Sequence, residues 1–306
     1  VCSSDLVVLA DERPCAAKAR NLGWRHARGA LVLFLDGDTE LHPDFVGHAL
    51  RALSAPEVCA VWGHRRESRP GQSIYTRLLD LDWLYRPGRV AYFGGDVLMR
   101  RAALEAVGGF DPALGAGEEP ELSSRLRQAG WQIEHLDVPM TRHDLAITDF
   151  RAYARRAYRS GLAYAEVAER MRQRGDAMWQ REARRDWWQG GLMWATGPLL
   201  LALALLSPPV AGAALALLTG LAALMLVRTA WRCAWKAPGR PGLLLAYAAH
   251  LYLQKMPAWL GQWHWRSGCG AIPAPDYKAP APTTGPDRKS TRLNSSHGYI
   301  SYAVFC

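Results

Sequence analysis

Cysteine is scarce in this chain: six residues among 306, scattered along the sequence and never spaced as Cys-x-x-Cys. A recognisable secretory signal peptide is also lacking, and the two absences favour a reduced, cytoplasmic domain over a disulfide framework. No basic-aromatic recognition motif accompanies the formal net charge of +9, so this charge does not indicate binding to nucleic acid. No internal repeat is evident.

Charge itself is missing from residues 187–227, which contain no Asp, Glu, Lys or Arg. The stretch is long enough for two membrane-spanning helices of about 20 residues each. Ser-Pro-Pro at 207–209 predicts the turn between spans at 187–206 and 210–227. A buried helix pair of a soluble protein is the alternative. Basic residues flank both outer ends, so the positive-inside rule predicts a multi-pass inner (cytoplasmic) membrane protein with both ends cytoplasmic. They are Arg181, Arg184, Arg185, Arg228, Arg232, Lys236 and Arg240.

The segments around this hairpin are also expected to meet the membrane. Residues 150–186 have helical apolar spacing among many arginines, which predicts amphipathic connector helices on the membrane surface. Within 228–270, the apolar stretch at 243–265 contains His250, Lys255 and Pro257, so it either lies in the interface, which we favour, or crosses a third time. Residues 271–286 are a Pro- and Ala-rich linker.

A continuous apolar run at residues 30–35 predicts a buried strand of an α/β sheet. Asp36 and Asp38 follow at its carboxyl end, the edge where open α/β sheets bind ligands. Two carboxylates separated by one residue of extended chain point to the same side. Such oxygens suit Mg²⁺ or Mn²⁺, which take their remaining ligands from a substrate diphosphate. The sequence therefore predicts a metal and phosphate site at this edge.

Four more motifs accompany this strand in a fixed order. They are Ala-Arg-Asn-Leu-Gly at 19–23, Phe-Gly-Gly-Asp at 93–96, Gly-Gly-Phe-Asp-Pro at 108–112 and Gly-Glu-Glu-Pro-Glu-Leu at 117–122. In this order they resemble the family 2 glycosyltransferases, over residues 7 to 144. The resemblance implies an α/β fold, a Rossmann-like GT-A nucleotide-sugar domain over residues 7–149. The processive motif Gln-x-x-Arg-Trp is absent, which argues for transfer of one or few sugars.

The resemblance also implies roles for individual residues. Glu119 is the expected catalytic base and Glu118 its acidic partner; in the family the second acidic residue is more often Asp, so which carboxylate takes the proton stays open. Pro120 is expected at the first helical position, where the helix dipole would keep Glu119 charged. Asp38, Asp36 and His143 are the expected metal ligands, with Asp144 available to orient the histidine.

Nucleotide and sugar contacts complete the expected site. Arg20, Asn21, Lys18 and Asp36 are the expected nucleotide-sugar-binding residues. For Lys18, considered by itself, a position on a solvated basic helix face is the favoured alternative. Gly95 and Asp96 are expected to contact the acceptor or sugar, and for Asp96 a simple turn is an equal alternative.

Both ends of the chain look foreign. Residues 1–6 and 287–306 resemble the two strands of a sequencing adapter read as codons, so we exclude them from the predicted fold. Family members begin with two strands that carry base- and ribose-binding residues, whereas this chain enters at a later strand, at residues 6–10. We therefore expect an incomplete nucleotide pocket here and an active enzyme from the longer parent gene.

Together these observations predict metal-dependent, inverting transfer of a sugar from a UDP- or GDP-sugar to a lipid-linked or saccharide acceptor. The reaction would occur at the cytoplasmic membrane face, in the assembly of a cell-envelope polysaccharide, with Mn²⁺ or Mg²⁺ as cofactor. Two alternatives stay open. One is a catalytically silent membrane module that only binds a sugar or lipid, and the other is a nucleotidyltransferase, whose chemistry also uses paired aspartates and a metal.

Overall fold

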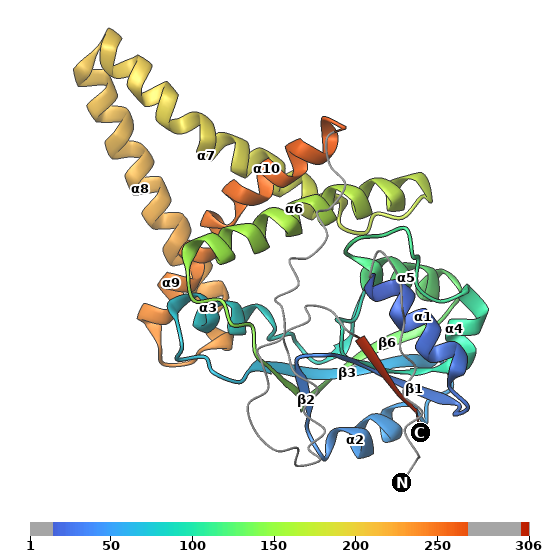
Figure 1. Ribbon diagram of the computed structural model, residues 1–306. Coiled ribbons are helices and arrows are strands. Elements are labelled where there is room, and N and C mark those ends of the chain that lie inside the picture. Colours follow the sequence, from blue (N-terminus) through green and yellow to red (C-terminus); the bar gives the residue numbers. More distant parts are fainter. Residues whose placement is uncertain (1–14, 269–300, 306) are drawn as a thin grey trace, which may run out of the picture. The chain divides into compact units, whose positions relative to one another are not determined.

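The computed structural model describes residues 15–268 and 301–305. The chain divides into two compact units. The first consists of residues 1–69, 85–145 and 272–306, and the second of residues 70–84 and 146–271. The strands of one sheet lie in the first unit and the long helices in the second (Figure 1).

The first unit is built on a mixed sheet in the order β2-β6-β3-β5-β1-β7, with β4 pairing β6. β3 and β6 run parallel, and the other pairs are antiparallel. The strands are β1 (Leu31–Asp36), β2 (Thr39–Leu41), β3 (Val58–Glu67), β4 (Gly88–Arg89), β5 (Val97–Arg100), β6 (Gln132–His143) and β7 (Ser301–Phe305). β1, β5 and the first half of β3 are almost continuously apolar, as expected for strands whose two faces are both covered.

Four helices cover this sheet: α1 (Ala16–His26), α2 (Phe45–Ala52), α4 (Arg101–Val107) and α5 (Glu118–Gln128). In Figure 1, α2 lies on one side of the sheet and α5 on the other. Arg125 fixes α5 through hydrogen bonds from its guanidinium to the carbonyl oxygens of Val107 (2.6 Å) and Gly109 (2.7 Å), at the end of α4. This anchor fixes the last turn of α5, while its first turn carries the two glutamates, which Arg20 links to the end of β1.

The predicted strand at 30–35 is present as β1, and the structure extends it to Asp36. β6 is a long strand that continues to His143, because its second half pairs with β2 and with the end of β3. Part of the excluded tail also joins the fold, since Ser301–Phe305 pairs with β1 as an antiparallel strand. The backbone groups on that side of β1 thereby gain partners. The strand expected at 6–10 and the linker at 271–286 lie outside the described residues.

The second unit contains α3 (Ile74–Asp82), α6 (Phe150–Gln173), α7 (Gln180–Leu206), α8 (Pro208–Arg232), the 3-10 turn η1 (Ala234–Lys236), α9 (Pro241–Leu253) and α10 (Lys255–Arg266). Helix α6 begins where Asp149 accepts a hydrogen bond from the backbone N–H of Ala152 (2.9 Å). It covers the first part of the amphipathic segment predicted at 150–186, and residues 180–186 of that segment form the start of α7. Helices α7 and α8 form a hairpin that extends away from α6, α9 and α10 (Figure 1).

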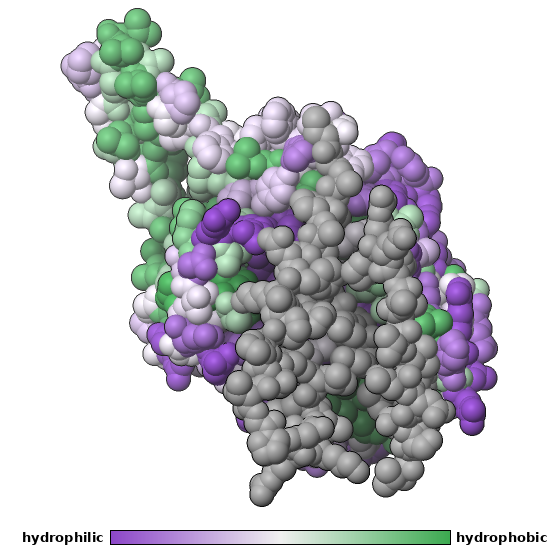
Figure 2. All heavy atoms as spheres, viewed as in Figure 1, coloured by the Kyte–Doolittle hydropathy of each residue, from purple (hydrophilic) through white to green (hydrophobic). Residues whose placement is uncertain are grey.

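The hairpin matches the uncharged stretch, and its turn is tighter than predicted. Only Ser207 separates the two helices, since Pro208 and Pro209 already form the first turn of α8, where a missing N–H costs nothing. Both helices are long and apolar enough to cross a membrane, and almost no residue in the apolar window of either is buried. The part of the hairpin visible in Figure 2 is mostly hydrophobic.

The stretch at 243–265 is two helices, not one. α9 has 13 residues and α10 has 12, and each falls short of the roughly 20 needed to cross a bilayer. α10 packs tightly on α6: a Cβ on Gly161 would overlap the backbone of Ala258, and one on Gly261 would overlap the carbonyl of Tyr158. The two helices therefore approach backbone to backbone, which only glycine permits at these positions.

A buried polar network ties α3 and α6 to α9 within the same unit. His250 Nε2 lies 3.1 Å from Asp82 Oδ2, and its Nδ1 lies 2.7 Å from the hydroxyl of Tyr153. Tyr247 donates to the other oxygen of Asp82 at 2.7 Å. Burial raises the pKa of Asp82, but the hydrogen bonds and charge of these partners lower it more, so the net pKa is below its usual value.

Candidate active site

Asp36 ends β1 with both carboxylate oxygens occupied by arginines. Its Oδ1 accepts from Arg20 at 3.0 Å and its Oδ2 from Arg65 at 2.9 Å. Burial raises the pKa of Asp36, but the charges of Arg65 and Arg20 outweigh it and bring the pKa to about 2. Asp36 is therefore an ionised, buried carboxylate held by two guanidinium groups. Asp36 is one of the two aspartates expected to bind the metal, and both of its carboxylate oxygens are bound to arginines.

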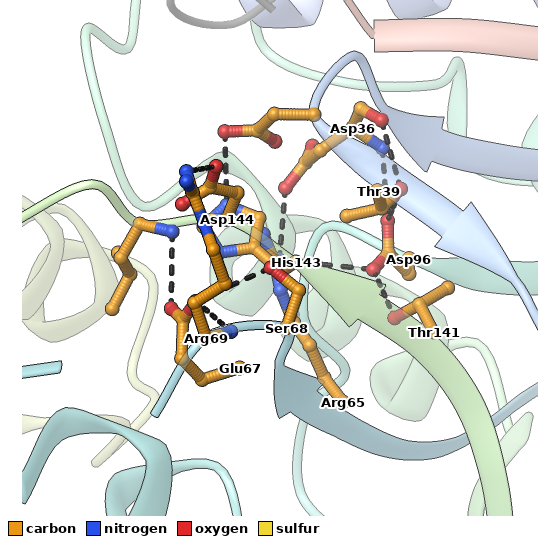
Figure 3. A network of polar contacts seen from close by, with 12 residues as sticks. Asp36, Thr39, Arg65, Glu67, Ser68, Arg69, Asp96, Thr141, His143 and Asp144 are labelled. Atoms are coloured by element: carbon orange, nitrogen blue, oxygen red, sulfur yellow. Dashed lines mark hydrogen bonds and ion pairs between the residues drawn. The ribbon is translucent and has the colours of Figure 1, made fainter. Parts of the chain in front are cut away.

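Asp96 supports the end of β1 from inside the protein (Figure 3). Its Oδ1 accepts from the backbone N–H of Asp36 (2.8 Å) and from Thr39 (3.3 Å), and its Oδ2 accepts from Thr141 (2.6 Å). Burial raises its pKa. Asp96 thus brackets β1, β2 and β6 from within, and its expected contact with the acceptor or sugar stays a prediction. Gly95, expected beside it, lies against the carboxylate of Asp36.

Asp38 and His143 form a separate pair at the same edge. His143 Nε2 lies 3.0 Å from Asp38 Oδ2, and the Asp38 side chain is 32% exposed. One carboxylate oxygen and one imidazole nitrogen are a donor set that fits Mn²⁺ or Mg²⁺ when substrate phosphates supply the other ligands. Among the described residues, no group of three or more His, Cys, Asp or Glu side chains is arranged to hold a metal by itself. Asp144, expected to orient His143, is ion-paired with Arg69.

Glu118 and Glu119 open α5, two residues earlier than the predicted start at Pro120. Both carboxylates approach one nitrogen of Arg20, at 2.8 Å and 3.0 Å. Burial and the neighbouring Glu118 raise the pKa of Glu119 to about 7, against the lowering effect of Arg20. The helix N-terminus therefore does not keep this residue as acidic as the sequence suggested. A carboxylate with a pKa near the operating pH is well matched to general-base chemistry.

The expected nucleotide residues on α1 mostly face inward. Arg20 is 1% exposed and bound to carboxylates. Asn21 donates to the carbonyl of Phe110 (2.7 Å) and accepts from the N–H groups of Phe110 (2.9 Å) and Trp24 (3.0 Å). These bonds fasten the 108–112 loop to α1 and leave the amide little capacity for a nucleotide. Only Lys18 is partly exposed.

Sequence reasoning missed Arg65, Thr39, Thr141 and Ser123. Arg65 is the second guanidinium on Asp36, and Ser123 accepts from the N–H of Phe93 (3.4 Å) while donating to the carbonyl of Glu119 (2.6 Å). A signal for Arg65 existed: consecutive arginines follow a buried apolar strand, at a sheet edge where ligand residues gather. The threonines and the serine gave none, because such residues are common at exposed strand and helix positions.

The arrangement defines a class of protein: an α/β domain with an Asp-x-Asp strand end, a paired-glycine loop and an acidic helix start around one buried arginine. Residues 6–108 match the model of "Glycosyl transferase family 2". Over these residues the chain is similar to the family 2 glycosyltransferases. A search of curated proteins finds no match.

One of two similar solved structures bears on the fold. A mannosyltransferase from Pyrobaculum calidifontis, PcManGT, in complex with GDP-Man and Mn²⁺, matches with a TM-score of 0.53 and 22% identity, over 81% of this chain and 69% of its own. TarS from S. aureus, residues 1–349, matches with a TM-score of 0.38 and 12% identity, over 85% of this chain and 73% of its own. The first of these supports a GT-A fold followed by helices.

Proposed function

We propose that this protein transfers a sugar, with inversion, from a nucleotide-sugar donor to a lipid-linked or saccharide acceptor at the cytoplasmic face of the inner membrane. The observation that carries the proposal is Glu119, a mostly buried carboxylate at the start of α5 with a pKa of about 7, held 3.0 Å from Arg20. At neutral pH about half of this carboxylate is ionised, so it can accept a proton from an acceptor hydroxyl.

The chemistry needs one proton transfer and one substitution. Glu119 takes the proton of the acceptor hydroxyl while the oxygen of that hydroxyl forms a bond to the anomeric carbon. The bond from that carbon to the diphosphate breaks, and its electron pair leaves with the nucleoside diphosphate. Asp38 and His143 are the residues that would hold Mn²⁺ or Mg²⁺, which when bound neutralises charge on the diphosphate. Lys18, partly exposed on α1, is the cation that would contact the nucleotide there.

Membrane attachment supports a lipid-linked acceptor. The α7–α8 hairpin has apolar windows with 6% and 0% of residues buried, and a soluble protein rarely exposes so large an apolar surface. Arginines flank its base on both helices, including the exposed Arg184, Arg185, Arg228 and Arg232. This is the charge distribution expected for cytoplasmic flanks of a bilayer hairpin.

The test compares wild-type protein with Glu119→Gln in detergent, using GDP-mannose and UDP-glucose as donors and Mn²⁺ or Mg²⁺ as cofactor. The GDP-mannose and Mn²⁺ pair is the first choice because PcManGT was solved with both. We expect wild-type protein to release nucleoside diphosphate. In Glu119→Gln the rate of this release should fall at least about a hundredfold, while the variant still binds the metal and the nucleotide. A variant that keeps the wild-type rate would point to a nucleotidyltransferase. Binding without turnover in both proteins would point to a silent module.

A further inference from the structure

Arg20 touches both groups of carboxylates in the site, the one at the end of β1 and the one at the start of α5. Its two terminal nitrogens reach three carboxylates: Glu118 at 2.8 Å, Glu119 at 3.0 Å and Asp36 at 3.0 Å. They come from two places in the chain: Asp36 ends β1, and Glu118 and Glu119 begin α5. The guanidinium lies 5.3 Å from the centre of the Phe110 ring, which covers it.

Burial changes what such an arginine can do. With 1% exposure and its terminal nitrogens engaged, Arg20 has no free face to offer a diphosphate. A buried guanidinium is stable only when paired, and a cluster of three carboxylates is stable only when a cation lies among them. The arginine and the acidic residues are therefore interdependent, and removing either leaves a buried charge uncompensated.

We propose that Arg20 is a positioning residue that holds Glu119 and Glu118 in register with Asp36 and keeps Glu119 ionised for proton abstraction. This inference rests on the proposed role of Glu119 as the base. Arg20 acts through that carboxylate and does not itself touch substrate. The expectation that Arg20 lines the nucleotide is replaced by this role.

The charges around Glu119 predict in which direction its titration should move when each of them is removed. Glu118 on the same helix and Asp36 from β1 disfavour its ionised form, and Arg20 from α1 favours it. Behind Asp36 lie Arg65 on β3, at 2.9 Å, and Asp96. An opposite charge within about 4–6 Å shifts a carboxyl pKa down by roughly 1–3 units. Removing Arg20 should therefore move the titration of Glu119 upward by that amount, whereas removing Glu118 should move it downward.

The experiment is a pH titration of side-chain carboxyl ¹³C signals in the full chain, labelled at glutamate and held in detergent. Glu119→Gln assigns the signal by deleting it. Wild-type protein should show a midpoint near 7. We expect a higher midpoint in Arg20→Gln, a lower one in Glu118→Gln, and no change in Arg28→Gln, which removes an exposed charge just after α1. Arg20→Lys keeps a cation and should stay within about one unit of wild type.

The acid limb of the pH–rate profile, measured with the active donor, should shift to higher pH in Arg20→Gln together with the Glu119 midpoint. This variant should therefore regain part of its activity at pH 9. An unmoved Glu119 midpoint in Arg20→Gln would overturn the inference, as would equal loss of activity at every pH. If Arg20→Gln does not fold, the isosteric Glu118→Gln decides, because an unchanged midpoint there is equally contrary. The titration needs no turnover, so it separates failure of this inference from failure of the proposed function.

Discussion

Gly95 lies directly against the carboxylate of Asp36. A Cβ atom at position 95 would come within 2.7 Å of Asp36 Oδ1 and 2.8 Å of its Cγ. Because Arg20 and Arg65 hold the two oxygens of that carboxylate, it cannot retreat without weakening an ion pair. The second glycine of the paired-glycine motif is therefore required for its small size, which lets the loop before β5 close over the end of β1.

Gly95→Ala should consequently damage the site more than the fold. We expect at least a tenfold loss of turnover, since the added methyl group displaces Asp36 from its arginines, and a lower melting temperature by several degrees. The measurement is donor turnover together with a thermal melt. Gly47→Ala is the control, because a Cβ there meets nothing within 4 Å and the position lies within α2. Equal activity of the two variants would contradict the prediction.

Asp38→Asn should weaken metal binding without unfolding the domain. Its side chain is 32% exposed and pairs with His143 at 3.0 Å, so loss of the charge should remove a metal ligand and little else. We expect the affinity for Mn²⁺ in the presence of GDP to fall at least about tenfold, measured by calorimetry. Asp44→Asn, at an exposed carboxylate before α2, should bind normally. If sugar transfer by Asp38→Asn matched wild type, the metal assignment would be wrong.

These predictions depend on features that the sequence could and could not supply. The strand ending in Asp36 was predictable because an apolar run and its acidic end are local patterns. The partners of Asp36 were not, because Arg65 lies 29 residues away and reaches it only when β1, β5 and β3 lie side by side. For the same reason Arg20 was expected to face a diphosphate: its charge is visible in the sequence, and its burial among three carboxylates is not.

The helical unit shows the same division. The amphipathic pattern of α6 and the uncharged hairpin were read from periodicity and composition, which the structure reproduces within a few residues. The break between α9 and α10 at Gln254 was not predicted, because the apolar pattern continues through it. What breaks the stretch is tertiary packing: α10 turns to lie on α6 and α7, where Gly161, Gly190 and Gly261 make room for it.

The stability of the protein should fall in acid partly through Asp82. A carboxyl group with a folded pKa below its unfolded value of about 3.9 stabilises the fold above that pH, and the contribution is lost as the pH falls through the folded pKa. Thermal melts between pH 6 and pH 3 should thus show a drop that is shallower in Asp82→Asn, which cannot lose a charge. Asp44→Asn should keep the wild-type slope, and a wild-type slope in both would rule out this contribution.

The crossing of α6 and α10 should tolerate no side chain at Gly161. In Gly161→Ala the new methyl group would overlap the backbone of Ala258, so the helices must separate. We expect a loss of roughly 1–3 kcal/mol in unfolding free energy, the usual cost of overpacking. Gly212→Ala in α8, where a Cβ meets nothing within 4 Å, should be neutral or slightly stabilising. Urea unfolding in detergent measures both, and equal stability would contradict the predicted close contact.

A charge in the hairpin should release the protein from the membrane. Leu217 is 65% exposed near the middle of α8, so Leu217→Arg places a charge where a bilayer would lie. Insertion should become less favourable by about 2.5–3.5 kcal/mol, seen as protein extracted by carbonate from the membrane fraction. Leu50→Arg, on α2 of the other unit, adds the same charge at an exposed leucine and should remain membrane-bound. Retention of Leu217→Arg would argue against a spanning hairpin.

The close approach of α6 and α10 also has an evolutionary consequence. Gly161 faces the backbone of α10 and Gly261 faces the backbone of α6, so each glycine makes room for the opposite helix. A larger residue at either position pushes both helices apart and thereby relieves the size limit on the other. Selection should therefore act on positions 161 and 261 as one unit, so that among related chains they stay small together or enlarge together.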